Sequence, residues 1–153
     1  MRLYPDAVPV IYMVEQVALY AAAVDAWLSA AEVLQVVSDL TRMECRVEPM
    51  RDGNGGLLND DSDYFAYFEG AVAEIAALSG EGIDRATAIR AQYRFKTPDA
   101  IHLAATAISG CTVFLTNDHR LDRFPISPSR SSDPRISSTN TPLRRRARHR
   151  RMD

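Results

Sequence analysis

Cysteine is scarce in this sequence, and the scarcity excludes two classes of protein. The chain of 153 residues contains Cys45 and Cys111, far apart and without metal-ligand spacing. Isolated cysteines build neither a disulfide framework nor a cysteine-rich zinc site. We therefore expect both thiols to be reduced and packed as small hydrophobic groups.

Long apolar runs are also lacking. The most apolar stretch, residues 17–31, is interrupted by Asp25 and is too short to span a membrane. The N-terminus lacks the charged, apolar and small-residue pattern of a signal peptide. We expect a cytoplasmic protein with no membrane partner.

Basic residues are outnumbered by acidic ones over most of the chain. Lys96 is the single lysine, and six of the 18 basic residues are arginines between Arg144 and Arg151. The preceding residues are distinctly acidic, although the formal net charge is only −2. An acidic body does not favour a DNA-reading surface, whereas it fits a protein that concentrates cations or binds a basic partner.

The composition that remains is that of a globular protein, with 46% hydrophobic and 25% charged residues. We predict one domain over residues 1–126. Residues 127–153 are rich in Ser, Pro and Arg and are predicted to be a disordered tail. The terminal arginines either contact nucleic acid or acidic surfaces, or are solvated without a role.

Strand and helix patterns alternate along the domain. Apolar, β-branched segments predict strands at residues 2–6, 33–37, 71–78 and 112–115. Helical patterns fall at residues 8–31 (two helices, with a break near Ala22 or Asp25), after Ser38 or Asp39, from residues 59–63 onward, at 82–93 and at 97–108, with one turn at 119–124. We assign Thr97 as the N-cap and Pro98 as the first residue of the 97–108 helix. The alternation predicts an α/β fold with a central parallel sheet covered on both faces.

Four acids occupy positions that such a fold can bring together. Asp6 ends the first predicted strand, Glu44 lies in the helix after the second, Asp99 opens a helix, and Asp118 follows a late strand. Individually, each has a simpler explanation as a cap, a helix-dipole partner or a solvated residue. Together they would meet where parallel α/β sheets bind ligands, at the carboxyl ends of the strands.

Clustered carboxylates require a cation to offset their repulsion. Oxygen ligands favour Mg²⁺ or Mn²⁺, and we see no His/Cys set that competes. Such ions activate water and stabilise the leaving oxygen of a phosphodiester.

Two other kinds of magnesium or calcium site fit the sequence poorly. A phosphotransfer receiver needs paired acids after its first strand and a late lysine. The segments 52–54 and 61–63 lack the glycine and closing glutamate of an EF-hand loop.

Several motifs occur in an order that resembles the PIN domain, and more narrowly the VapC ribonuclease toxins of bacterial type II toxin–antitoxin pairs. They are LYPD at 3–6, VIYMVE at 10–15, SDLT at 38–41 followed by Glu44, KTPDAIHLAA at 96–105, FLTND at 114–118 and RLDRF at 120–124. The resemblance extends from Met1 to about Phe124. It implies a three-layer α/β/α fold.

The resemblance also implies site residues and partners. Asp6, Glu44, Asp99 and Asp118 correspond to metal-binding acids, and Thr116 to a hydroxyl residue that orients the site. RNA cleavage would depend on Mg²⁺ or Mn²⁺ and would leave 5′-phosphate and 3′-hydroxyl ends. A small antitoxin would cover the cleft, with an arginine that reaches the carboxylates, and the chain would form a homodimer.

Other residues within the motifs receive weaker assignments. Asn117 is given no role, and Glu15 and His102 are expected to be structural. Arg94 and Lys96 either contact RNA phosphates or, as we favour, are surface charges.

Three departures from the family pattern leave a second hypothesis open. Ala7 stands where a small hydroxyl residue is frequent, Pro5 stands where an apolar strand residue is usual, and no apolar strand follows residue 124. The second hypothesis is a binding module of this fold that no longer cleaves RNA but still binds an antitoxin.

Overall fold

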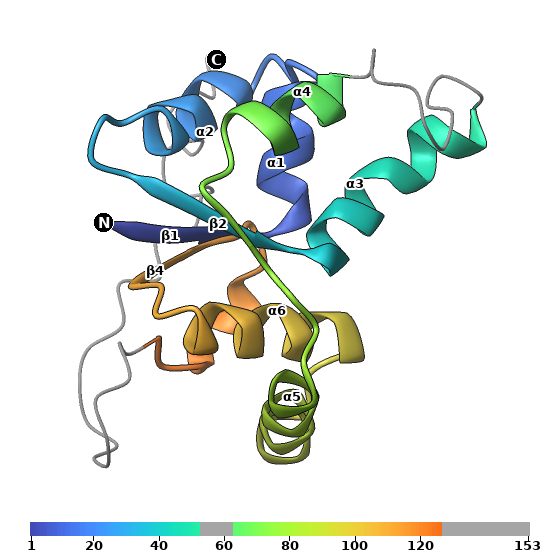
Figure 1. Ribbon diagram of the computed structural model, residues 1–153, viewed down its shortest axis with the longest axis vertical. Helices are drawn as coiled ribbons and strands as arrows, with labels where there is room; N and C mark the ends of the chain where they lie inside the picture. Colours follow the sequence, from blue (N-terminus) through green and yellow to red (C-terminus); the bar gives the residue numbers. More distant parts are fainter. Residues whose placement is uncertain (53–62, 127–153) are drawn as a thin grey trace, which may run out of the picture.

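The computed structural model describes residues 1–52 and 63–126 (Figure 1). Its strands are β1 (Arg2–Pro5), β2 (Leu34–Ser38), β3 (Glu74–Ala76) and β4 (Val113–Leu115). Its helices are α1 (Ala7–Val14), α2 (Ala21–Leu28), α3 (Asp39–Arg51), α4 (Asp63–Gly70), α5 (Gly80–Tyr93) and α6 (Thr97–Ile108), followed by the 3₁₀ helix η1 (His119–Arg123). All strand pairs are parallel, in the order β3-β2-β1-β4.

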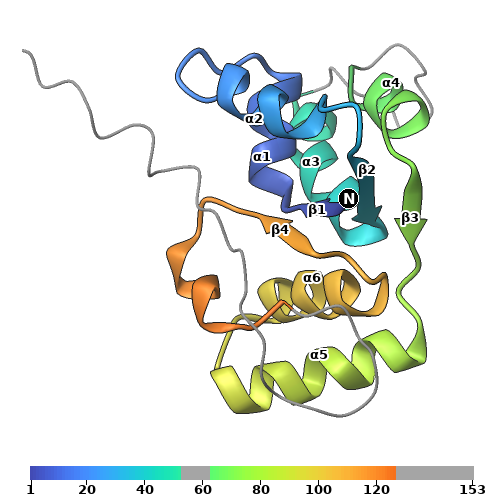
Figure 2. The ribbon, with the colours of Figure 1, turned by 90° about the vertical axis from the view of Figure 1, so that its left-hand side faces the viewer.

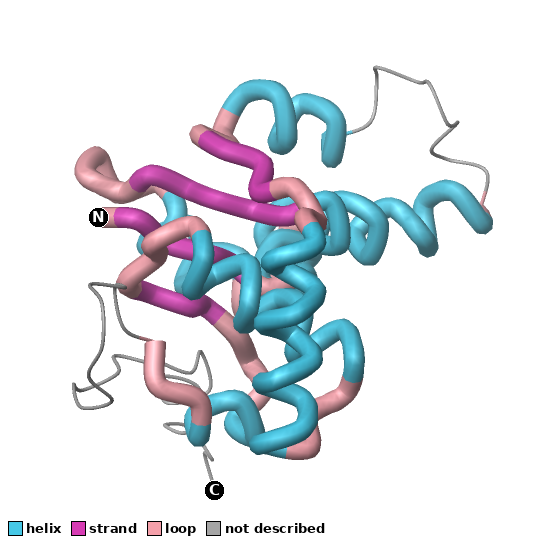
Figure 3. Tube along the Cα trace, turned by 60° about the horizontal axis from the view of Figure 1, so that its bottom comes forward, coloured by secondary structure: helices cyan, strands magenta, loops and turns pink. Residues whose placement is uncertain are grey.

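The sheet is the middle of three layers. Helices α1 to α4 cover one face, while α6 covers the other and α5 packs outside α6 (Figures 1 and 2). The strands lie side by side in Figure 3, with helices on both sides. This arrangement confirms the predicted three-layer α/β fold with a central parallel sheet.

Alternating strand residues build the two sides of the core. Tyr4, Val36 and Phe114 belong to the cluster that includes α5 and α6. Their neighbours Leu3 and Val37 point to the opposite face, where they pack against α1 to α4. Side chains that alternate in this way are expected from strands buried on both faces.

Two features differ from the sequence prediction. The break in the first helical region lies at residues 15–20, not near Ala22 or Asp25. There Gln16 adopts a positive φ of 53°, and Tyr12 stacks on Tyr20 with ring centroids 4.5 Å apart. No glycine or proline marks this reversal in the sequence. The N-cap of α6 is Lys96, so Thr97 and Pro98 are its first two helical residues.

The remaining strands and helices confirm the prediction with small shifts at their ends. The third strand is shorter than predicted and forms an exposed sheet edge. Pro5 is the last residue of β1 and is paired with Leu115 of β4, whereas the β1–β2 pairs involve only Arg2 and Leu3. Pro5 therefore lies where the pairing of β1 ends, and its missing N–H does not interrupt the hydrogen bonds between the strands.

Both cysteines are free and buried, as predicted. Among the described helices, none has the length and apolarity that a membrane crossing demands. The predicted acidic start at residues 59–62 and the tail at 127–153 lie outside the described residues.

Candidate metal centre

The carboxyl ends of β1, β2 and β4 meet at one edge of the sheet. Asp6 follows β1 and caps α1, because its Oδ1 accepts a hydrogen bond of 2.8 Å from the Ala7 amide. Thr116 follows β4, and its hydroxyl donates to Asp6 Oδ2 over 2.9 Å. The Asp118 amide donates to the Thr116 hydroxyl oxygen over 3.1 Å. Thr116 therefore connects Asp6 to the backbone that carries Asp118.

A cleft of about 570 Å³ lies at this edge. It is lined by every acid predicted from the sequence, namely Asp6, Glu44, Asp99 and Asp118. Glu15, Asn117 and His102 line it as well. Elements from both ends of the chain therefore contribute carboxylates to a single concave surface.

Within the cleft, one group of side chains is centred on His102. Its Nε2 lies 2.9 Å from Glu44 Oε2 and 3.5 Å from Asp6 Oδ1. These three residues offer ligand atoms that all lie within 4.8 Å of one another. A single histidine therefore joins the oxygen ligands in this part of the cleft.

His102 was predicted to be structural, and a structural contact accounts for one of its ring nitrogens. Its Nδ1 lies 2.9 Å from the Tyr4 hydroxyl oxygen. That hydroxyl donates to Ser38 Oγ at 2.6 Å and lies 3.1 Å from Thr41 Oγ1. The spacing of Asp99 and His102, three residues apart in one helix, was the available sequence signal that both side chains share a face.

A second group joins two lining residues of the cleft, Asp99 and Asp118, to Arg120. The Arg120 guanidinium forms a bidentate ion pair with Asp118, with Nε 2.9 Å from Oδ1. Its terminal nitrogen lies 3.9 Å from Asp99 Oδ2. The RLDRF motif that contains Arg120 did not by itself predict this contact.

The pKa values of the two carboxyl groups shift in opposite directions, because hydrogen bonding dominates at Asp118 and burial dominates at Asp99. Hydrogen bonds from Arg120 hold the pKa of Asp118 below its usual range. Burial raises the pKa of Asp99, with further contributions from Asp118 and Asp6, while Arg120 opposes the change. A raised pKa is typical of a carboxylate that lacks enough positive charge nearby.

Glu15 has a local explanation, because its Oε1 accepts a hydrogen bond of 2.7 Å from the Tyr64 hydroxyl. Asn117 Nδ2 donates to the Tyr12 hydroxyl oxygen over 3.2 Å. Arg94 and Lys96 are exposed at the α5–α6 junction and do not line the cleft.

The donor set of the cleft fits a divalent cation. Carboxylate oxygens are the ligands that Mg²⁺ and Mn²⁺ prefer, and an ion would offset the repulsion among the acids. Thr116 holds Asp6 in the way that outer hydrogen bonds orient metal ligands.

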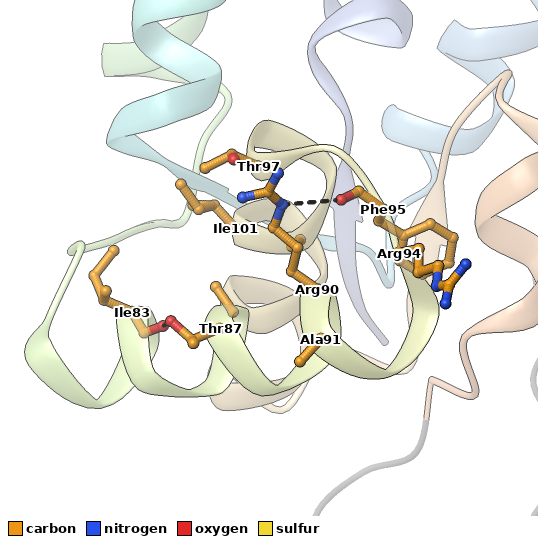
Figure 4. A pocket seen from close by; sticks show the side chains of 10 residues that line it. Ile83, Thr87, Arg90, Ala91, Arg94, Phe95, Thr97 and Ile101 are labelled. Carbon is orange, nitrogen blue, oxygen red and sulfur yellow. Dashed lines mark hydrogen bonds between the residues drawn. The ribbon is translucent and has the colours of Figure 1, made fainter.

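A second cavity, of about 550 Å³, lies between α5 and the start of α6 (Figure 4). Figure 4 shows Ile83, Ile101 and Phe95 around it, with Arg90 donating to the Phe95 carbonyl oxygen over 3.3 Å. Its described lining residues include no carboxylate. It offers none of the chemistry of the acidic cleft.

The acidic cleft lies outside the carboxyl ends of the strands, where parallel α/β sheets bind their ligands. The PIN domain family model matches residues 3–126, so the chain belongs to the PIN domain family. A comparison with curated protein sequences gives no match.

Two solved structures are similar to the chain. One is described as a toxin–antitoxin complex from Klebsiella pneumoniae, with 21% identity and a TM-score of 0.60, covering 84% of this chain and 98% of that chain. The other is VapBC2 from Rickettsia felis bound to a promoter DNA fragment, with 11% identity and a TM-score of 0.61, covering 82% of this chain and 94% of that chain. At these identities the similarity establishes the fold.

Proposed function

We propose that this protein is a metal-dependent endoribonuclease and the toxin component of a VapBC-type pair. The observation that carries the proposal is the convergence of Asp6, Glu44, Asp99 and Asp118 on one cleft. PIN domains are generally nucleases, and both similar structures are toxin–antitoxin assemblies. The motifs of the sequence favour the same activity.

Mg²⁺ or Mn²⁺ would be held by Asp6 and Asp99, with Glu44 and Asp118 completing the site directly or through water. When bound, such an ion activates water and neutralises charge on the phosphate. Thr116 keeps Asp6 oriented through its hydrogen bond of 2.9 Å. Arg120, released from Asp118, is positioned to contact a phosphate oxygen.

The proposed partners are an RNA substrate and a small antitoxin. The contact of Arg120 with Asp118 illustrates how a guanidinium fits these carboxylates. An antitoxin arginine would exploit the same geometry. We also propose that the protein is cytoplasmic and forms a homodimer. Light scattering of the purified chain tests the dimer. A monomer at micromolar concentration would contradict the dimer without affecting the proposed chemistry.

RNA cleavage by Asp6→Ala and Asp99→Ala variants tests the activity. We expect Mn²⁺-dependent cleavage of a labelled RNA by the wild-type chain and none by either variant. Asp84→Ala, which alters an exposed acid of α5, is the matched control and should cleave like the wild type. Circular dichroism verifies folding. Cleavage that survives both cleft substitutions would refute the assignment.

The alternative is a binding module that no longer cleaves RNA. The observation that favours it is the ion pair between Arg120 and Asp118, which engages one of the proposed metal-binding carboxylates. Calorimetric titration with Mn²⁺ separates the two functions, because a nuclease site binds the ion whereas an inactive one does not.

A further inference from the structure

His102 is almost fully buried, yet it lines the acidic cleft. Its side chain is 3% exposed, and its Nε2 is directed at the carboxylates of Asp6 and Glu44. One proton on Nε2 can serve one hydrogen bond, and that bond goes to Glu44 at 2.9 Å. Asp6 Oδ1 lies 3.5 Å from the same nitrogen, which has no second proton to donate to it. A single cation between the three groups would serve both carboxylates.

The distances from Nε2 to the two carboxylates are those of neighbouring ligands. First-row divalent ions bind nitrogen and oxygen at about 2.1 Å, so adjacent ligand atoms lie about 3.0 Å apart in an octahedron and about 3.4 Å apart in a tetrahedron. The observed separations of Nε2 from Glu44 and Asp6, 2.9 and 3.5 Å, cover this range.

The other ring nitrogen is anchored as it is in metal-ligating histidines. Such histidines usually bond an oxygen partner through their second nitrogen, which sets the ring orientation. Here the partner is the hydroxyl of Tyr4, a fully buried residue tied to Ser38 and Thr41. When this hydroxyl donates to Ser38, its oxygen accepts from Nδ1–H. Nε2 then binds an ion once it has released the proton that it shares with Glu44 in the metal-free protein.

We propose that His102 Nε2 is a metal ligand beside Asp6 and Glu44, and that the centre therefore prefers Mn²⁺ or a later first-row ion to Mg²⁺. This inference rests on the proposed function, since it concerns the same cleft. Imidazole suits first-row transition ions, whereas Mg²⁺ is bound mainly by oxygen. His102 therefore determines which cation the cleft selects.

Electron spin echo spectroscopy of the full chain loaded with Mn²⁺ tests the ligand directly. We expect modulation from a directly bound ¹⁴N nucleus in the wild type and in His119→Gln, which alters an exposed histidine of η1. His102→Gln should lose it. The wild-type spectrum, with ¹⁵N-histidine labelling to identify the nucleus, remains decisive even when the His102 variant does not fold.

Calorimetry with Mn²⁺ and Mg²⁺ tests the preference. His102→Gln should weaken Mn²⁺ binding about tenfold or more and Mg²⁺ binding much less. Equal losses for both ions, or bound Mn²⁺ without nitrogen coupling, would overturn the inference while leaving the nuclease proposal intact. A wild-type chain that binds no Mn²⁺ would overturn both.

Discussion

Arg120 contacts two of the carboxylates that we propose as metal-binding groups. Its guanidinium pairs with Asp118 and lies 3.9 Å from Asp99. Because its side chain remains 59% exposed, it can leave the cleft without unfolding any element. At the scale of single residues, it is therefore an internal competitor for a bound cation.

The substitution Arg120→Gln should tighten Mn²⁺ binding by about threefold or more, because exposed charge pairs compete weakly in water. Calorimetric titration measures the affinity. Arg123→Gln is the matched control, since Arg123 stacks on Phe95 at 4.9 Å and donates to backbone carbonyl oxygens rather than to a carboxylate of the cleft. Unchanged or weaker binding in the Arg120 variant would show that the arginine does not compete.

The same ion pair makes stability depend on pH. Arg120 lowers the pKa of Asp118 in the folded protein, so the pair stabilises the fold above the unfolded pKa of about 3.9. This contribution is lost as the pH falls through the lower, folded pKa. Without metal, the difference in unfolding free energy between wild type and Arg120→Gln should be largest at neutral pH and should vanish in strong acid. Urea denaturation in EDTA at several pH values measures it, and a pH-independent difference would contradict the assignment.

At the scale of elements, two helices begin with serine caps in different surroundings. Ser38 caps α3 in a capping box with Thr41, and its buried hydroxyl also accepts from Tyr4. Ser79 caps α5 through a bond of 3.1 Å from the Gly82 amide at an exposed position. The same residue type therefore performs a second task at α3, where it supports the anchor of His102.

Ser79→Ala should reduce the unfolding free energy by about 1 kcal/mol, the usual value of a cap. Ser38→Ala should cost about 2–4 kcal/mol, because it also leaves the buried Tyr4 hydroxyl with one acceptor fewer. Urea denaturation of the two variants gives the comparison. Equal costs would mean that the buried hydroxyl network adds nothing to the cap.

At the scale of the whole molecule, the cleft is carried by a core on both sides of the sheet. Leu103 of α6 is fully buried in the cluster that also contains Tyr4 and Phe114. Leu103→Ala should lower the unfolding free energy by about 2–5 kcal/mol, whereas Ile108→Ala, at a position 39% exposed in the same helix, should cost less than about 1 kcal/mol. Thermal and urea unfolding test both values, and similar losses would contradict the described packing.

Much of this architecture was predictable because it depends on local patterns. The apolar strands alternating with helical periodicity predicted the parallel sheet, and the carboxyl ends of its strands indicated where the acids would meet. The reversal at residues 15–20 was not predictable in position. It depends on the stacking of Tyr12 on Tyr20 and on a positive φ at Gln16, without a glycine or proline to signal it.

Residue types and their spacing in the sequence were sufficient to predict the parallel sheet, its two covering layers and the four acids at its carboxyl edge. The roles of His102 and Arg120 were decided only by folding. His102 meets Asp6 and Glu44 because β1, α3 and α6 converge although they lie far apart in the sequence. Arg120 turns back onto Asp118 and towards Asp99 because η1 follows β4 after the short segment 116–118 and brings Arg120 to the start of α6. Such contacts depend on side-chain direction and burial, which spacing in the sequence does not specify.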